Sequence, residues 1–269
     1  SLKINWQREI ANYSDRSVYI AESKKFSTES DFVIVNYDIL KNFHDTDPKK
    51  KEESILVQSN FDIVILDEAH MISNVQAQRT KIINHFAKKI NSKLIYSGSS
   101  SRWHNPHISP YACYKHMGEE ICKMYKEVYK LNIEIARFYN VYGPNEIMDS
   151  DWAAVIGLWR RQIRDGQPIT IVGDGEQRRD FTHIDDIVDG LYKLGFTDEK
   201  HEDGWEFGTG FNYSINEISH MLVDKFGCEV KYIPNQKGNY QETLRENNDA
   251  LNKLNWKPQD RLKQYINSL

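Results

Sequence analysis

The alternation of short β-branched runs with longer helix-like segments is the feature that most constrains the fold. Runs rich in Val and Ile occupy residues 17–21, 31–36 and 61–66, each bounded by polar stretches, as buried strands are. Strands and helices that take turns along a chain favour an α/β fold, with a parallel sheet and flanking helices. Further expected elements are helices 76–90, 109–130, 151–164, 185–196, 214–226 and 259–268, and strands 93–97, 133–137, 168–172 and 230–233.

Local signals mark where some of these elements begin. The order strand, helix, strand over residues 61–97 predicts a right-handed parallel crossover. Ser109 followed by Pro110 is typical of a helix start, with Ser as the N-cap. Ser214 and Glu217 have the spacing of a capping box, which predicts a helix from about this point.

Composition excludes several classes of function. The 269 residues carry a net charge of -4, which indicates neither a nucleic-acid partner nor an anionic membrane. Cys113, Cys122 and Cys228 are widely spaced, with no CxxC motif and no cluster of His beside them, so we expect no disulfide framework and no metal site. No apolar run approaches the roughly 18 residues of a membrane span, and the first residues do not resemble a signal peptide. We therefore expect a cytoplasmic chain.

Tyr111 and Lys115 are four residues apart on a predicted helix, so both side chains emerge on one face. A phenol with a pKa of about 10 is a poor base at neutral pH. A neighbouring ammonium group stabilises the phenolate and makes the tyrosine a usable acid or base. The alternative is a chance pair of exposed helix residues, because this spacing is common in proteins.

Downstream motifs add to this pair. Residues 136–144 have the sequence ARFYNVYGP and residues 173–186 the sequence GDGEQRRDFTHIDD, and residues 254–258 (LNWKP) follow. In this order and at these intervals they closely resemble the C-terminal two-thirds of NAD-dependent epimerases/dehydratases, the extended short-chain dehydrogenase/reductase type that acts on nucleotide sugars. The resemblance covers about residues 93–269 and implies a Rossmann-like sheet with a smaller C-terminal substrate-binding region.

The resemblance implies roles for individual residues at the catalytic end. Tyr111 would take a proton from a sugar hydroxyl as hydride leaves for NAD, and Lys115 would bind the nicotinamide ribose and tune Tyr111. Ser99 best matches the catalytic hydroxyl position, with Ser100 as the alternative. Tyr139 would lie near the nicotinamide. Tyr111, Lys115 and Tyr139 are thus the expected cofactor-binding residues.

The same resemblance implies substrate-binding residues. Asn140 and Arg179 would contact the diphosphate, which suits a planar guanidinium group, and Thr170 and Val172 would enclose the nucleotide base. Other interpretations remain open at this stage. Arg179 beside Asp180 could form a surface ion pair, and three further residues could be purely structural: His183 as a helix cap, and Trp152 and Trp159 as core residues.

Two departures from the family pattern qualify the substrate chemistry. The dehydratase branch has an Asp-Glu pair just after the catalytic hydroxyl, whereas Ser100 and Ser101 follow it here, which favours epimerisation over dehydration. Near Gly238 the family often has an arginine for the diphosphate, and this chain has Gln236 and Lys237. The grip on substrate there is expected to be weaker or different.

Residues before 93 do not carry the expected cofactor site. No GxGxxG motif occurs in the sequence, although NAD binding needs a glycine-rich turn at a helix N-terminus. Residues 2–10, 33–38 and 61–70 instead resemble the first RecA-like lobe of a Swi/Snf-type superfamily 2 helicase. Asp67 and Glu68 would hold Mg²⁺ only if that half were functional. The P-loop and the second lobe are both missing, so we expect no ATP hydrolysis.

The two resemblances meet near residues 90–98. We therefore interpret the chain as two parts, a helicase-like α/β fragment over 1–92 and an epimerase-like region over 93–269. The hypothesis is a chimera from a recombinant, truncated or misassembled reading frame, which amplification across codons 85–105 would test. The sequence leaves three hypotheses for function. They are an NAD-dependent nucleotide-sugar epimerase or its degenerate remnant, a helicase-type ATPase fragment that binds DNA, and a non-catalytic nucleotide-sugar-binding module. Family resemblance also suggests a homodimer.

Overall fold

The computed structural model describes residues 2–43, 54–59, 61, 63–65, 77–89, 93–151 and 153–269. It divides into two compact units, Ser1–Ser92 and Lys93–Leu269. Each unit has its own buried core, so we describe each by itself.

The first unit is a small α/β assembly. It contains α1 (Leu2–Tyr13), β1 (Val18–Ile20), β2 (Phe32–Ile34), the 3₁₀ helix η1 (Tyr37–Asn42), α2 (Ile55–Gln58) and α3 (Gln78–Lys89). Strands β1 and β2 pair in parallel, with Tyr19 opposite Val33. The core consists of apolar side chains from η1, α2, α3 and the residues directly after β1 and η1: Ala21, Leu40, Phe43, Leu56, Ile82, Ile83 and Phe86.

The strand predicted over residues 61–66 is not present in the part of it that the structure describes. Phe61 and residues 63–65 have no strand conformation, and Ile63, Val64 and Ile65 are 60%, 42% and 70% exposed. β-branched residues favour strands mainly where they can pair with a neighbouring strand and pack against a core. The predicted crossover over 61–97 is therefore wrong at its first strand, although its helix and second strand form as α3 and β3 (Leu94–Ser99).

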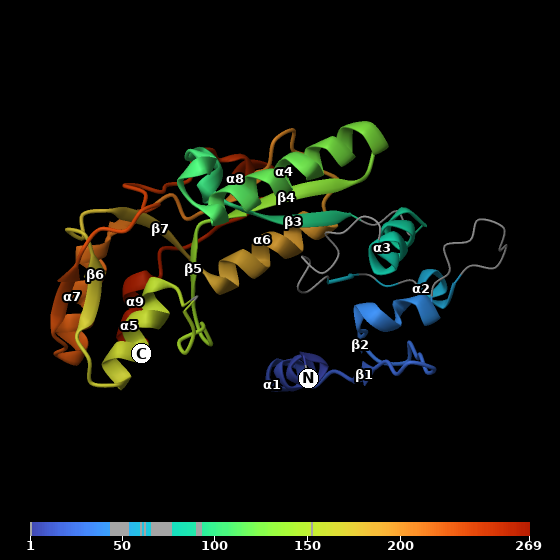
Figure 1. Ribbon diagram of the computed structural model, residues 1–269, viewed down its shortest axis with the longest axis horizontal. Coiled ribbons are helices and arrows are strands. Elements are labelled where there is room, and N and C mark those ends of the chain that lie inside the picture. Colours follow the sequence, from blue (N-terminus) through green and yellow to red (C-terminus); the bar gives the residue numbers. More distant parts are fainter. Residues whose placement is uncertain are drawn as a thin grey trace. The chain divides into compact units, whose positions relative to one another are not determined.

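The second unit is built on a parallel sheet with the order β3-β4-β8, in which β4 spans Ile133–Phe138 and β8 spans Trp205–Phe207. Helix α4 (Pro110–Tyr129) covers one face of this sheet and α6 (Ile184–Phe196) the other (Figure 1). Alternate residues of β4 point to opposite faces. Ile133 and Ile135 pack with Cys122 of α4, whereas Ala136 packs with Ile187 of α6.

Two further sheets complete this unit. Strands β5 (Asn140–Tyr142), β7 (Arg178–His183) and β9 (Asn212–Ser214) form one, and β6 (Ile169–Val172) pairs in parallel with β10 (Val230–Ile233). Helices α5 (Val155–Arg164), α7 (Ile215–Phe226) and α9 (Leu262–Ser268) pack around a core that includes Trp159, Ile171 and Ile218. Helix α8 (Asp249–Lys253) contributes Ala250 to the cluster shared by α6 and β8.

Several helix starts follow the local sequence signals. The Ser109 hydroxyl accepts a hydrogen bond from the Ala112 amide, as the Ser-Pro signal predicts. The capping box of Ser214 and Glu217 is complete in both directions. His183 caps α6, because its Nδ1 accepts from the Asp185 amide, which confirms its structural interpretation. Trp159 is buried in the core, and Trp152 lies outside the described residues.

Among the described residues, no helix is both long and apolar enough to cross a bilayer.

Candidate active site

The end of β3 and the first turns of α4 hold the three predicted catalytic residues. Ser99 is the last residue of β3, and Tyr111 lies in the first turn of α4 with 57% of its surface exposed. The Lys115 Nζ donates to the Ser97 carbonyl at 2.9 Å and lies 5.9 Å from the centroid of the Tyr111 ring. Burial lowers the pKa of Lys115, while the nearby Glu119 carboxylate opposes this shift. Tyr111 is thus open to a ligand, with an ammonium group beside it.

Ser99 is more confined than Tyr111. Its hydroxyl accepts a hydrogen bond from the Ser101 amide and caps a short 3₁₀ helix, η3 (Ser100–Trp103). Ser100, the alternative, begins that helix. The Ser101 hydroxyl is buried without a hydrogen-bond partner in the described structure. The repeated serines therefore occupy different environments, which their identical side chains could not indicate.

Glu119 joins the catalytic helix to the sheet. Tyr111, Lys115 and Glu119 are successive i, i+4 neighbours on α4, and Glu119 is only 1% exposed. Its Oε2 accepts from Arg137 Nε at 3.1 Å and Nη2 at 2.9 Å, and its Oε1 accepts from the Ser99 amide at 3.5 Å. Gly98 permits this approach, because a Cβ there would lie 2.6 Å from Oε1. Sequence reasoning missed Glu119 and Arg137.

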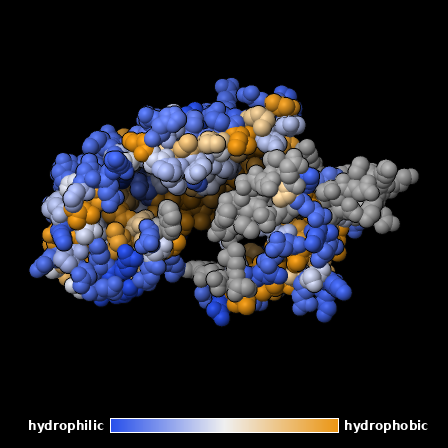
Figure 2. Space-filling view, viewed as in Figure 1, coloured by the Kyte–Doolittle hydropathy of each residue, from blue (hydrophilic) through white to orange (hydrophobic). Residues whose placement is uncertain are grey.

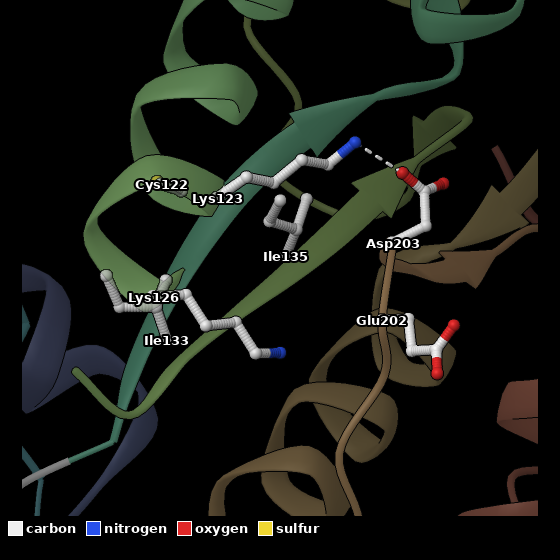
Figure 3. Close-up of a pocket in the computed structure, with 7 residues that line it drawn as sticks. All are labelled: Cys122, Lys123, Lys126, Ile133, Ile135, Glu202 and Asp203. Carbon is white, nitrogen blue, oxygen red and sulfur yellow. Dashed lines mark hydrogen bonds and ion pairs between the residues drawn. The ribbon is translucent and has the colours of Figure 1, made fainter. Parts of the chain in front are cut away.

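The ion-pair network continues away from the catalytic face. Arg137 Nη1 donates to Asp203 at 2.5 Å, and Lys123 Nζ donates to the same carboxylate at 2.6 Å. These two cations hold the pKa of Asp203 well below its usual range, against the effect of burial. A cavity of about 10 Å³ lies beside them (Figure 3), lined by Cys122, Lys123, Lys126, Ile133, Ile135, Glu202 and Asp203. This space suits about one water molecule and no nucleotide.

Arg179 on β7 is a buried cation without a described acidic partner. It is 9% exposed, and its guanidinium donates only to neutral oxygens: the Arg178 carbonyl at 2.8 Å, Asn239 Oδ1 at 2.6 Å and the Tyr240 carbonyl at 2.6 Å. No carboxylate of the described residues pairs with it, and burial lowers its pKa. An ion pair with Asp180 is therefore the wrong interpretation.

Asp180 has a separate structural role. Its carboxylate accepts from the Thr209 amide and hydroxyl, both at 2.8 Å, and from the amides of Gly210 at 3.0 Å and Arg245 at 3.2 Å. Burial raises the pKa of Asp180, and these donors oppose the shift. Asp180 thus holds residues 209–210 and Arg245 in place, and its carboxylate oxygens are occupied by these donors.

Two segments meet beside Arg179. The His104 ring stacks on the Tyr240 ring, with centroids 3.9 Å apart and planes inclined by 15°. Gly238, two residues before Tyr240, lies close to the turn that contains His104 and Ile108. A Cβ at Gly238 would lie 3.2 Å from the Ile108 carbonyl oxygen. Burial raises the pKa of Tyr240; the nearby Tyr111 adds to this shift and the Arg179 cation opposes it. The structure therefore brings the predicted diphosphate residue into contact with Tyr240 and the predicted acid/base into its neighbourhood.

Tyr139 and Asn140 follow β4 directly. Tyr139 is buried, and its hydroxyl donates to Glu206 Oε2 at 3.0 Å, so burial and that carboxylate both raise its pKa. Asn140 Oδ1 accepts from the Thr243 hydroxyl at 3.5 Å. Thr243, the partner of Asn140, also accepts from the Asp180 amide. The Tyr139 hydroxyl, in contrast, is engaged by the Glu206 carboxylate.

Thr170 and Val172 lie on β6, in the sheet with β10. The Thr170 hydroxyl accepts from Gln162 Nε2 at 3.0 Å, and the Thr170 carbonyl accepts from Trp159 Nε1 at 2.7 Å. The Val172 carbonyl accepts from Gln177 Nε2 at 2.9 Å. Their role at a nucleotide base stays a prediction.

The residues present fit NAD only in part. Tyr111 and Lys115 lie together at the start of α4, and their role at a nicotinamide ribose stays a prediction. The first glycine of the sequence is Gly98, so residues 1–97 contain no glycine turn that could receive the pyrophosphate. Asp67 and Glu68 lie outside the described residues. Elsewhere in the described parts, no group of three or more His, Cys, Asp or Glu could hold a metal ion.

Two protein families match parts of the chain. Residues 91–204 match the family described as NAD dependent epimerase/dehydratase, and residues 2–100 match the SNF2-related domain. Both predicted resemblances are therefore confirmed.

Curated relatives agree with the first match. A UDP-glucuronate 4-epimerase of Thermodesulfobacterium geofontis is 34% identical over 177 residues, which are 61% of this chain and 52% of the relative. A UDP-glucose 4-epimerase of Mycolicibacterium smegmatis is 30% identical over 58% of this chain and 49% of the relative. The chain thus spans about half the length of these two relatives.

Solved structures share the fold. The epimerase Mth375 of Methanothermobacter thermautotrophicus has a TM-score of 0.68 at 20% identity, over 97% of this chain and 85% of that one. The UDP-glucuronic acid 4-epimerase of Bacillus cereus, solved with UDP-glucuronic acid and NAD, has a TM-score of 0.59 at 23% identity, over 72% and 69%. The fold is α/β with parallel sheets and matches Rossmann-type epimerase structures.

Replacing Glu119 with Ala should destabilise the second unit by about 3–5 kcal/mol, because it leaves the Arg137 cation buried with one carboxylate fewer. The adjacent Glu120 is half exposed, so Glu120→Ala is a matched control with an expected change below about 0.5 kcal/mol. Urea unfolding followed by tryptophan fluorescence would measure both, since the Trp103 ring lies over Arg137. Equal midpoints for the two variants would contradict the role given to Glu119.

Proposed function

Because residues 91–204 belong to the NAD dependent epimerase/dehydratase family, we propose that this chain is the remnant of a nucleotide-sugar epimerase and still binds a nucleotide sugar. The single observation that carries the proposal is the buried Arg179 guanidinium, which has no carboxylate partner in the described structure. A bound diphosphate would supply the missing negative charge.

The energetics of burial support this role for Arg179. A charged group removed from water is costly unless it is paired and hydrogen-bonded. The carbonyls of Arg178 and Tyr240 and the Asn239 amide satisfy some of its N–H groups but contribute no net charge. Phosphate oxygens match the planar fork of donors on an arginine. The relatives named above act on sugars linked to UDP, which contains such a diphosphate.

Tyr111, Lys115 and Ser99 would then face the sugar end of the ligand. Tyr111 is exposed near the Tyr240 ring, so a ligand held by Arg179 could extend toward it. Asn140 is proposed to assist at the diphosphate, and Thr170 and Val172 to line the base. In this family NAD accepts and returns the hydride. Since these 269 residues fit only its nicotinamide-ribose end, we propose ligand binding without turnover.

The match of residues 2–100 to the SNF2-related domain supports a second candidate function, a helicase-type ATPase fragment that binds DNA. The absence of glycine before residue 98 also removes the phosphate-binding P-loop that such an ATPase requires. Hydrolysis of ATP stimulated by DNA would favour this alternative over the epimerase remnant.

A homodimer is proposed through α4. Its exposed apolar residues Tyr114, Met117, Ile121, Met124 and Val128 are spaced three and four apart, as in a coiled-coil seam. Apolar side chains are visible along α4 in the space-filling view (Figure 2). Such a row fits the same row on a second copy, because two-fold pairing brings one surface against itself.

The Arg179→Gln variant should bind UDP-glucose at least about tenfold more weakly than the wild type, since hydrogen bonds to charged groups contribute about 1.5–3 kcal/mol. Arg178→Gln is the matched control, because Arg178 is the neighbouring residue but pairs with Glu217 and Asn212. Isothermal titration calorimetry would measure both, with thermal unfolding to verify folding. Equal affinities of the two variants would refute the role of Arg179.

NADH should not bind at concentrations up to about 1 mM, because residues 1–97 contain no glycine turn that could receive its pyrophosphate. Titration of the protein with NADH, followed by cofactor fluorescence, would measure this, with UDP-glucose added to the same sample as the positive control. Tyr111→Phe should leave UDP-glucose binding unchanged. Saturable NADH binding in the micromolar range would contradict the proposal of ligand binding without turnover and favour an NAD-dependent activity.

The Ile121→Glu variant should be a monomer where the wild type is a dimer, because it places a charge in the centre of the apolar row on α4. Val188→Glu is the control, since Val188 is similarly exposed but lies on α6. Analytical ultracentrifugation would distinguish the species. A wild-type chain that sediments as a monomer would contradict the interface.

A further inference from the structure

His104 and Tyr240 form a stacked pair beside Arg179, and neither belongs to the predicted catalytic or binding residues. His104 is the C-cap of η3, in the turn between β3 and α4, and its ring stacks on Tyr240. The Tyr240 carbonyl in turn accepts from Arg179 Nη2 at 2.6 Å. The imidazole and the guanidinium are thus held by the same residue, one by its ring and the other by its backbone.

Charged groups on β7 and in the segment after Tyr240 influence the pKa of His104. Burial is the main cause that lowers its pKa, and the Arg179 cation on β7 lowers it further. The Glu242 backbone hydrogen bond and the Glu246 carboxylate, both after Tyr240 in the chain, act in the opposite direction. His104 is therefore mainly neutral at pH 7, and the cation that lowers its pKa is one that a diphosphate would neutralise.

We propose that His104 is a second anion-binding residue, which takes up a proton when the diphosphate of a nucleotide sugar binds at Arg179. The inference rests on the proposed function and adds a residue and a pH dependence to that site. Before binding, a second positive charge beside Arg179 is unfavourable. After binding, two phosphate charges outweigh the one guanidinium charge, so the imidazolium form is stabilised.

The sign of the pH dependence follows from this linkage. The bound state has the higher pKa at His104 and therefore binds more protons than the free state. Affinity for the ligand should rise as pH falls through the range in which the bound protein is protonated and the free protein is not. Above that range His104 is neutral in both states, and affinity should be constant.

The experiment uses UDP-glucose, whose diphosphate is esterified at both ends and so lacks the ionisation near pH 6 of a terminal phosphate. Calorimetric titrations of the full chain from about pH 5.5 to pH 8, in two buffers of different ionisation enthalpy, give the affinity and the protons taken up. Wild type should bind about fivefold to tenfold more tightly at the low end and take up a fraction of a proton. GDP-mannose and ADP-glucose, which share the diphosphate, replace UDP-glucose if it does not bind.

Two variants separate proton uptake from a structural effect. His104→Asn should abolish both the pH dependence and the proton uptake while some binding remains at pH 8. His107→Asn is the matched control, because His107 lies in the same turn and is exposed, and it should behave like the wild type. Loss of affinity that is equal at every pH would assign His104 a packing role only.

The failures of the two proposals are distinguishable. Binding that depends on Arg179 but has no pH dependence would overturn the inference on His104 and leave the proposed function intact. A pH dependence that survives in His104→Asn would have the same meaning. Absence of binding by all three nucleotide sugars at every pH would overturn both proposals.

Discussion

The pairing of Glu119 with Arg137 is the interaction on which the site depends. It joins the helix that carries Tyr111 and Lys115 to the strand that leads into Tyr139 and Asn140. The same carboxylate reaches the Ser99 amide, so a single buried side chain relates the catalytic helix to two neighbouring strand ends. Removal of either charge leaves the other buried, which lowers the stability of the second unit. The position of the helix that carries Tyr111, relative to the sheet, would then change as well.

Arg137 and Arg179 illustrate two different uses of a buried arginine. Arg137 is fully buried and contacts two carboxylates, so its charge is compensated within the protein. Arg179 is nearly as buried and contacts only neutral oxygens. An arginine of the first kind stabilises the fold, whereas one of the second kind is arranged for an anion that the chain does not supply. This contrast distinguishes a binding residue from a structural one.

Short-range features could be predicted from the sequence. The N-cap at Ser109 and the capping box at Ser214 depend only on residues within one helical turn, and both are confirmed. The two family resemblances are also confirmed, because they rest on ordered motifs. The strand over 61–66 was wrong at its described residues, since β-branched composition does not specify a partner strand.

Long-range features could not be predicted in the same way. Glu119 could have been suspected from its spacing after Lys115, but its partner Arg137 is on another element. The stacking of His104 on Tyr240 joins residues far apart in the chain and has no local signal. The lack of a carboxylate at Arg179 is likewise a property of its surroundings, because Asp180 beside it points its oxygens at other donors.

The exposed run at Ile63, Val64 and Ile65 has a consequence for the life of the chain in a cell. Consecutive β-branched residues outside a sheet are an aggregation hazard, because they can pair with the same run on another molecule. Such segments are also the ones that chaperones and proteases recognise in incompletely folded chains. The amount of this protein that persists would then be set by quality control acting on the first unit, whatever the second unit binds.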